Sequence, residues 1–232
     1  TLIFKPKNAY AEYQSLMNFL IKAKTLTLEY KPYGADWYSC DIDILEVSKG
    51  EISQTGVLEI PITFAPISPI YAKSTKNFEF PTAPAKGQHY TYTYGVSYID
   101  SSQVGVLKIA ASDIDAQMPC DFTLKITKPL TAPIFTAKNL ETGNIIGRID
   151  LSAVSVESSQ TLIFTTKPTK AGVVIVNSDA STADITPQLG LSKGVPTFFQ
   201  LPPNTKLEFK CFAESLENLE VNLEVYKYYR TV

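Results

Sequence analysis

The chain has 232 residues, of which 44% are hydrophobic and 19% charged, a composition typical of globular rather than disordered proteins. Its 21 basic and 23 acidic residues give a formal charge of −2 without a long run of one sign. We therefore expect no sequence-specific nucleic-acid binding, because phosphate binding needs a concentrated basic face. No apolar stretch reaches the roughly twenty residues of a membrane-spanning helix, so we expect no membrane insertion.

Three cysteines, Cys40, Cys120 and Cys211, lie far apart in the sequence and form no CxxC or CxH pair. This spacing predicts free, buried thiols in a protein that folds in cytosol, rather than a metal or redox site. The chain begins at Thr1 without an initiator methionine. We therefore expect that residues upstream of Thr1 are missing from this sequence.

One helix is predicted near the start of the chain, in the segment 9–24 with Asn8 at its N-cap. Apolar residues recur at helical spacing on one of its faces: Tyr13, Leu16, Met17, Leu20 and Ala23. This face could pack in a core or dock a partner, and we favour the core.

A meander of three antiparallel strands is predicted after the helix, at 25–30, 37–47 and 57–64. The segment 57–71, VLEIPITFAPISPIY, starts as an alternating strand and then meets Pro66 and Pro69. Proline removes a backbone donor and restricts the preceding residue, so a ladder cannot continue through this segment. We expect one domain at 1–74 and a second at 75–232.

The Pro-rich segment 72–95 is interpreted as a linker that enters the second domain. Near its end Tyr90, Tyr92 and Tyr94 alternate on one face of a predicted strand. Such a row could stabilise a sheet or stack on a sugar, as could Trp37, the sole tryptophan. We favour the structural role for these four residues and keep them as the candidate carbohydrate-binding set.

Short strands then follow one another to the end of the chain. They are predicted at 103–110, 121–127, 132–139, 144–151, 161–166, 172–177, 198–201, 206–212 and 221–229. Turn residues separate nearly all of them, and no second helix is predicted. This pattern predicts a mainly β protein with an antiparallel sandwich or barrel, and we favour the sandwich.

Motifs of catalysis are absent from the sequence. No GxSxG, P-loop, GxGxxG or HExxH pattern occurs, and His89 is the only histidine. Asp113, Asp115 and Asp121 have a spacing found in some calcium loops, but no DxDxDG pattern extends it. We expect no enzyme, no catalytic residue, no cofactor and no metal, although a β-rich hydrolase remains an alternative.

Two blocks of the sequence resemble the distal tail proteins of long-tailed bacteriophages, the Dit-like tail components of siphophages. The N-terminal block contains AYAEYQSLMNFLIKA at 9–23, TLTLEY at 25–30, WYSCDIDILEVSKGEI at 37–52 and LEIPITFAPISPIYAK at 58–73. The resemblance rests on the motif Cys40-Asp41-Ile42 and on the motif SPIY at 68–71, near the end of this block. The C-terminal block contains GNIIGRIDLS at 143–152, PTFFQLPPNTKLEFKC at 196–211 and VNLEVYKYYRTV at 221–232.

This resemblance implies an N-terminal belt domain, with a small antiparallel sheet and one helix, followed by a galectin-like antiparallel β-sandwich. It further implies a homohexameric ring that continues the tail tube, with sandwiches that face outward, where receptor-binding or other baseplate proteins attach. The expected partners are the tail tube, the tail-tip hub and a receptor-binding protein. The expected location is the virion tail, after folding in the host cytoplasm. The same composition also suits a carbohydrate-binding β-sandwich on a phage or bacterial surface, which is the alternative.

Overall fold

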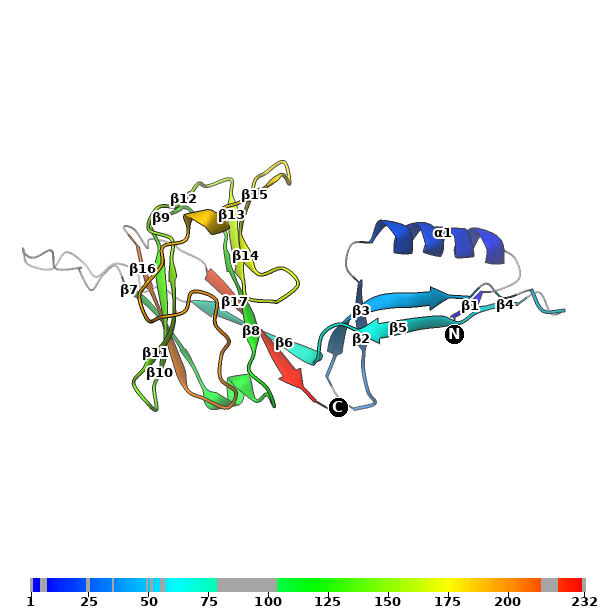
Figure 1. Cartoon of the computed structure of the whole chain (residues 1–232), viewed down its shortest axis with the longest axis horizontal. Coiled ribbons are helices and arrows are strands. Elements are labelled where there is room, and N and C mark those ends of the chain that lie inside the picture. The colour runs from blue at the N-terminus through cyan, green and yellow to red at the C-terminus, as the bar shows by residue number, and fades with distance from the viewer. Residues whose placement is uncertain are drawn as a thin grey trace, which may run out of the picture. The chain divides into compact units, whose positions relative to one another are not determined.

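The computed structural model describes residues 2–4, 8–23, 26–34, 36–48, 50, 52–54, 57–78, 104–213 and 221–230. The chain divides into two compact units. Unit 1 consists of Thr1–Ala72 with Tyr229–Val232, and unit 2 of Lys73–Tyr228. Antiparallel strands dominate this described part, with a single α-helix (Figure 1), so the predicted mainly β fold is confirmed. None of its helices is long and apolar enough to cross a membrane.

Unit 1 is a small antiparallel sheet with one helix. Its elements are β1 (Leu2–Phe4), α1 (Ala9–Lys22), β2 (Leu26–Tyr30), β3 (Tyr38–Val47), β4 (Leu58–Ile60), β5 (Ile62–Pro66) and the start of β6 (Ile70–Phe78). Strand β3 pairs with β2 on one side and with β5 on the other, while β4 pairs with β1. The predicted helix and the meander are therefore present.

Pro61 divides the strand predicted at 57–64 into two. Residues before it form β4, which pairs with β1, and residues after it form β5, which pairs with β3. Pro61 has no N–H to donate, but its carbonyl accepts a hydrogen bond from the Ser48 N–H at 3.1 Å. The chain can thus change partner strand at this residue.

Strand β6 corrects the prediction of a linker from residue 72 onward. The strand extends from Ile70 to Phe78, so the first part of the expected linker is regular β structure. Pro81 and Pro84, which suggested the linker, follow this strand and do not interrupt it. The rest of the predicted linker, from 79, lies outside the described residues.

Unit 2 contains two antiparallel sheets. One has the strand order β11-β10-β16-β7, formed by β7 (Val104–Ile109), β10 (Ile134–Asn139), β11 (Ile145–Asp150) and β16 (Leu207–Phe212). The other has the order β15-β14-β13-β8-β17-β6, formed by β6 together with β8 (Asp121–Ile126), β13 (Thr161–Thr165), β14 (Gly172–Val176), β15 (Thr182–Asp184) and β17 (Val221–Tyr229). Short strands β9 (Leu130–Thr131) and β12 (Ser155–Val156) pair separately, and two 3₁₀ turns cover Ala111–Ile114 and Thr186–Gln188.

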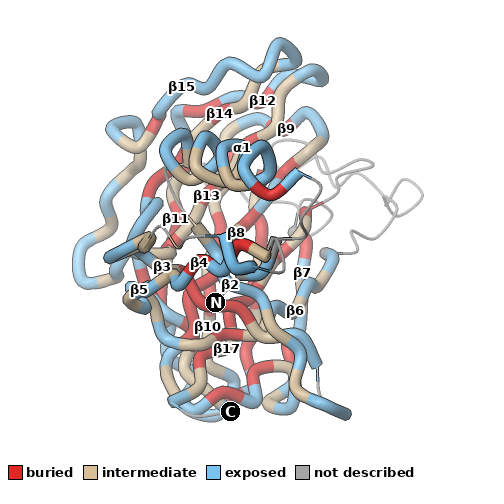
Figure 2. The backbone as a smooth tube through the Cα atoms, turned by 90° about the vertical axis from the view of Figure 1, so that its right-hand side faces the viewer, coloured by how far each residue is buried: buried red, intermediate tan, exposed pale blue. Residues whose placement is uncertain are grey.

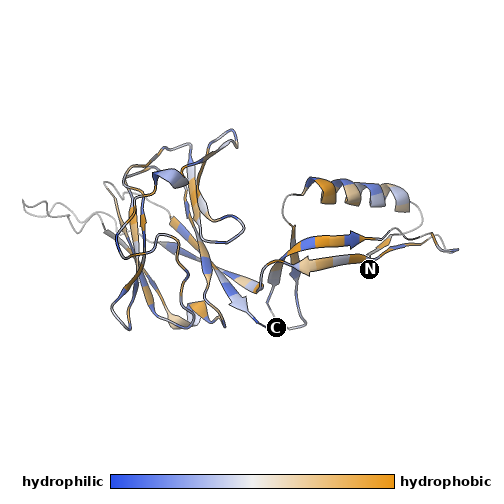
Figure 3. Ribbon diagram, viewed as in Figure 1, coloured by the Kyte–Doolittle hydropathy of each residue, from blue (hydrophilic) through white to orange (hydrophobic). Residues whose placement is uncertain are grey.

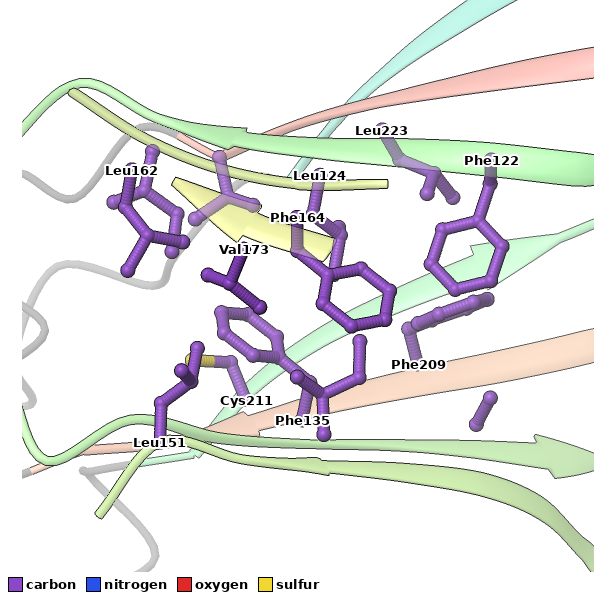
Figure 4. Close-up of a cluster of buried hydrophobic side chains, with 14 of the residues drawn as sticks. Phe122, Leu124, Phe135, Leu151, Leu162, Phe164, Val173, Phe209, Cys211 and Leu223 are labelled. Carbon is purple, nitrogen blue, oxygen red and sulfur yellow. The ribbon is translucent and has the colours of Figure 1, made fainter. Parts of the chain in front are cut away.

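The two sheets of unit 2 share one hydrophobic core. Alternate residues of each strand are buried, which is the pattern of sheets packed face to face. Phe122 lies at its centre, with ring centroids 5.8 Å from both Phe164 and Phe209 and 5.0 Å from Phe199. Figure 4 shows such side chains meeting from strands of both sheets. Unit 2 is therefore a β-sandwich.

The strand predicted at 198–201 is wrong. Leu201 forms an isolated bridge with Cys120, and no ladder extends from it. Pro196 and Pro202 lie on either side and lack the N–H groups that a longer ladder needs. Within this segment Phe199 instead packs its ring against Gly147, where a β-carbon would overlap it. The segment therefore closes the core without joining a sheet.

All three cysteines are free and buried. Cys120 and Cys211 belong to the core of the sandwich, and burial raises the pKa of the Cys120 thiol to about 11. Burial also raises the pKa of the Cys211 thiol. Since the thiolate is the reactive form, both side chains act as small apolar groups.

Candidate assembly surface

Unit 1 buries few of its apolar side chains. Its core cluster consists of Ala9, Leu58 and Ile60, all at most 3% exposed, with Tyr13 and Val47 among the partly buried residues around it. Helix α1 thus packs on the strands mainly through its first turns. The remainder of the helix and much of the sheet keep apolar groups in contact with solvent.

The exposed apolar residues of unit 1 form the candidate assembly surface. They are Ile3, Tyr10, Phe19, Ile21, Leu28, Tyr33, Trp37, Leu45, Ile52, Phe64 and Ile67. Unit 2 is the longer unit, yet its described residues include fewer of this kind: Val106, Leu140, Ile145, Leu191 and Phe198. Figure 2 shows that most of α1 is exposed or half-buried, and Figure 3 shows hydrophobic stretches along it. Exposed apolar residues at this density are typical of an interaction surface.

A groove of about 460 Å³, lined mainly by apolar residues, lies between the C-terminal half of α1 and the strands of unit 1. The helix contributes Met17, Leu20, Ile21 and Ala23, and the rest of the lining is Leu26, Ile42, Asp43, Ile44, Val47 and Ile67. Asp43 is the only charged residue among them. The helix face predicted to pack in a core therefore points towards the sheet. Its side chains Met17, Leu20 and Ala23 form a wall of the groove, and the space between helix and sheet stays partly open.

Asp41 organises a buried polar cluster beside this groove. Its side chain is almost fully buried, and its Oδ1 accepts hydrogen bonds from Thr27 Oγ1 at 2.9 Å and from Tyr71 OH at 3.0 Å. Its backbone N–H donates to Ser68 Oγ at 2.8 Å, and its carbonyl accepts from the Ile67 N–H at 2.8 Å. Because a buried carboxylate is costly without such donors, the cluster holds the turn after β5 firmly against β3.

The Asp41 cluster joins two motifs that the sequence placed far apart. Cys40-Asp41-Ile42 lies in β3, and SPIY at 68–71 lies at the exit of unit 1. Cys40 Sγ donates to the Ser68 carbonyl at 3.2 Å, which adds a second link between them. The structure thus gives both motifs a physical role: their hydrogen bonds fasten the last turn of unit 1 to strand β3.

Tyr71→Phe is expected to change how the stability of unit 1 depends on pH. Burial, followed by the negative charge of Asp41, raises the pKa of the Tyr71 phenol above its ordinary value. The unfolded chain therefore loses this proton first, and the free energy of unfolding falls as pH rises above about 10, by up to about 1.4 kcal/mol per pH unit. The variant lacks this contribution, and at neutral pH it loses about 1 kcal/mol with the hydrogen bond.

Denaturant unfolding followed by tryptophan emission measures this effect, because Trp37 is the sole tryptophan and lies in unit 1. Tyr33→Phe is the matched control, since Tyr33 is fully exposed. If the alkaline slopes of wild type and Tyr71→Phe coincide, the buried phenol has no part in the pH dependence.

The candidate carbohydrate-binding residues are only partly placed. Trp37 precedes β3 and is 61% exposed, so its ring is accessible. Tyr90, Tyr92 and Tyr94 lie outside the described residues, as does His89. The described part of the chain thus brings no second member of the set to Trp37, and a sugar site remains a prediction.

The aspartates that suggested a calcium loop are engaged in other contacts. Asp113 accepts a hydrogen bond from Lys76 Nζ at 2.9 Å, which lowers the pKa of its carboxyl group, and Asp115 pairs with Lys227 at 2.7 Å. Asp121 is buried and accepts from Tyr228 OH at 2.8 Å. Among the residues with assigned positions, no group of three or more potential ligands could hold a metal ion.

Comparison with known proteins matches residues 1–67 to the family model described as distal tail protein, N-terminal domain. This confirms the resemblance inferred from the N-terminal block. Two solved structures share the fold, both from the baseplate of phage P2 in its activated conformation. The chain from the structure with Ca has a TM-score of 0.61 and 16% identity, over 98% of this chain and 76% of that one. The chain from the structure with Sr has a TM-score of 0.58 and 16% identity, over 95% and 75%. No curated protein matched the sequence.

Proposed function

We propose that this chain is a structural component of the tail tip of a long-tailed bacteriophage, because residues 1–67 match the family model of the distal tail protein N-terminal domain. It acts as a ring-forming hub that joins the tail tube to the host-recognition proteins. Unit 1 is the belt domain of a homohexameric ring. The proposed domain limits are 1–74 for the belt domain and 75–232 for the second domain. Unit 2 is a galectin-like sandwich that presents outer surfaces to other baseplate proteins.

The observation that carries this proposal is the exposed apolar surface of unit 1. Residues such as Phe19 and Ile21 on α1, which are 62% and 77% exposed, gain free energy when a neighbouring subunit covers them. In a closed ring every copy buries this surface, so assembly stops at a defined size instead of continuing as a filament. The groove beneath α1 offers a further contact for the same neighbour.

The partners of such a ring follow from its place in the tail. The tail tube, the tail-tip hub and a receptor-binding protein contact it, and DNA passes through it without being read. The protein folds in the host cytoplasm and resides in the virion tail. It performs no catalysis, since its role consists of protein contacts alone.

The molar mass of the full chain in solution, measured by light scattering at several concentrations, tests this proposal. We expect hexamers, or trimers that pair into hexamers. A second candidate is a carbohydrate-binding sandwich, which the accessible ring of Trp37 favours. A protein that stays monomeric at every concentration and binds cell-wall polysaccharide would contradict the ring and support this candidate.

A further inference from the structure

The outer face of the four-stranded sheet in unit 2 carries a group of basic side chains. Buried residues such as Phe135, Phe209 and Cys211 point inward, so the residues between them point away from the core. The outward charged residues are Lys108 on β7, Lys138 on β10, Arg148 and Asp150 on β11, and Glu208 and Lys210 on β16. We refer to this surface as the cationic face.

The carboxylates of the cationic face are already neutralised. Lys210 pairs with Glu208 at 3.3 Å, and Arg148 pairs with Asp150 at 2.9 Å. Both carboxylate side chains are only 14% exposed, whereas those of Lys210 and Arg148 are 41% and 36% exposed. The positive partner of each pair is therefore the one that faces solvent.

Two further lysines, Lys108 and Lys138, bring the basic side chains of this face to four, against the two carboxylates Asp150 and Glu208. The strand register places Lys138, Glu208 and Lys108 in one row across β10, β16 and β7. Neither lysine takes part in an ion pair among the described residues. Apart from these groups, the β10–β11 turn adds one carboxylate, Glu141. The face is thus positive, although the chain as a whole has a net charge of −2.

Towards the opposite end, the same face also carries apolar side chains among its charged ones. Ile134 pairs with Phe212 in the row beyond Lys210, and Val106 lies directly opposite Lys210 on β7. Val106 is 38% exposed, and the other two side chains are half-buried. A ligand that covers the whole face must therefore offer both negative charge and apolar groups.

We infer that the cationic face binds an acidic segment of a partner protein, in extended conformation. Carboxylates of the segment contact Lys108 and Lys138, and its apolar side chains cover Val106 and Phe212. Side chains on one face of a strand recur at about 6.8 Å, and alternate residues of an extended segment have the same spacing. A phosphate polymer would satisfy the lysines but offers no groups for the apolar side chains, so a protein segment fits better. This binding does not depend on ring formation.

The test uses the full chain and a short fluorescent peptide, with glutamates at alternate positions of its first half, valines at alternate positions of its second half, and serines elsewhere. Fluorescence anisotropy measures its Kd. The variant Lys108→Glu/Lys138→Glu is expected to raise Kd at least about tenfold, because attraction becomes repulsion at two positions. Higher salt is expected to weaken wild-type binding as well, since ions screen exposed charges.

The matched control is Lys125→Glu/Lys170→Glu, which makes the same charge change at exposed lysines of the other sheet, on β8 and in the β13–β14 turn. Its Kd is expected to stay within about twofold of wild type. Val106→Ser is expected to raise the Kd of the peptide about fivefold while leaving polyphosphate binding unchanged. Far-UV circular dichroism verifies that each variant is folded.

Three results would overturn the inference. The first is no measurable binding of the peptide to the wild-type protein. The second is equal weakening by the control variant, which would indicate attraction without a site. The third is tighter binding of polyphosphate than of the peptide together with no effect of Val106→Ser on the peptide, which would identify a phosphate polymer as the ligand.

Discussion

The double substitution Phe19→Asp/Ile21→Asp is expected to prevent the proposed ring assembly and leave monomers. Both side chains are more than half exposed on α1, so their replacement should leave unit 1 folded. In an assembled ring the same positions would bury carboxylates, and each lost apolar contact costs about 1.5–3 kcal/mol in addition. Because every interface of the ring carries the change, its effects accumulate over the assembly.

Light scattering of the double variant beside wild type measures this effect. The matched control is Gln14→Asp/Asn18→Asp, which adds the same charge at exposed polar positions of the same helix. We expect the control to assemble like wild type. A double variant that still forms rings would place the subunit interface away from this part of α1.

Phe122→Ala is expected to lower the free energy of unfolding of unit 2 by about 3–5 kcal/mol. The side chain is fully buried. Its ring contacts those of Phe164 on β13, Phe209 on β16 and Phe199 in the segment 198–201. Its removal leaves a cavity among the aromatic side chains of the core. Aromatic contacts add to the loss of buried area.

Denaturant unfolding followed by far-UV circular dichroism measures this change, since the sole tryptophan lies in unit 1 and does not report on unit 2. Phe198→Ala is the matched control, because Phe198 is 42% exposed and stacks on Phe164 from the edge of the core. It is expected to cost about 1 kcal/mol. Equal losses in the two variants would contradict the central position of Phe122.

Periodicity in the sequence was sufficient to predict the helix and most strands. Apolar residues at helical spacing predicted α1, and alternation predicted strands such as β8, β13 and β16 close to their observed bounds. The strand predictions were wrong where a proline lies within or beside a stretch of alternating apolar and polar residues. Pro61 redirects one run to a second partner strand, and the prolines around 198–201 prevent another from joining a sheet. Strands of two or three residues, such as β9 and β15, are too short to show a pattern.

The sequence by itself therefore determined the fold class and which segments form a helix or a strand, because both follow from local spacing and turn chemistry. Tertiary structure alone decided what those residues do. Helical spacing identifies the apolar face of α1, but only packing shows that Phe19 and Ile21 stay exposed. The hydrogen bond between Asp41 and Tyr71 joins residues 30 positions apart, and Lys108 and Lys138 share a face only through strand register. Contacts at such separation depend on the whole chain, which no local pattern encodes.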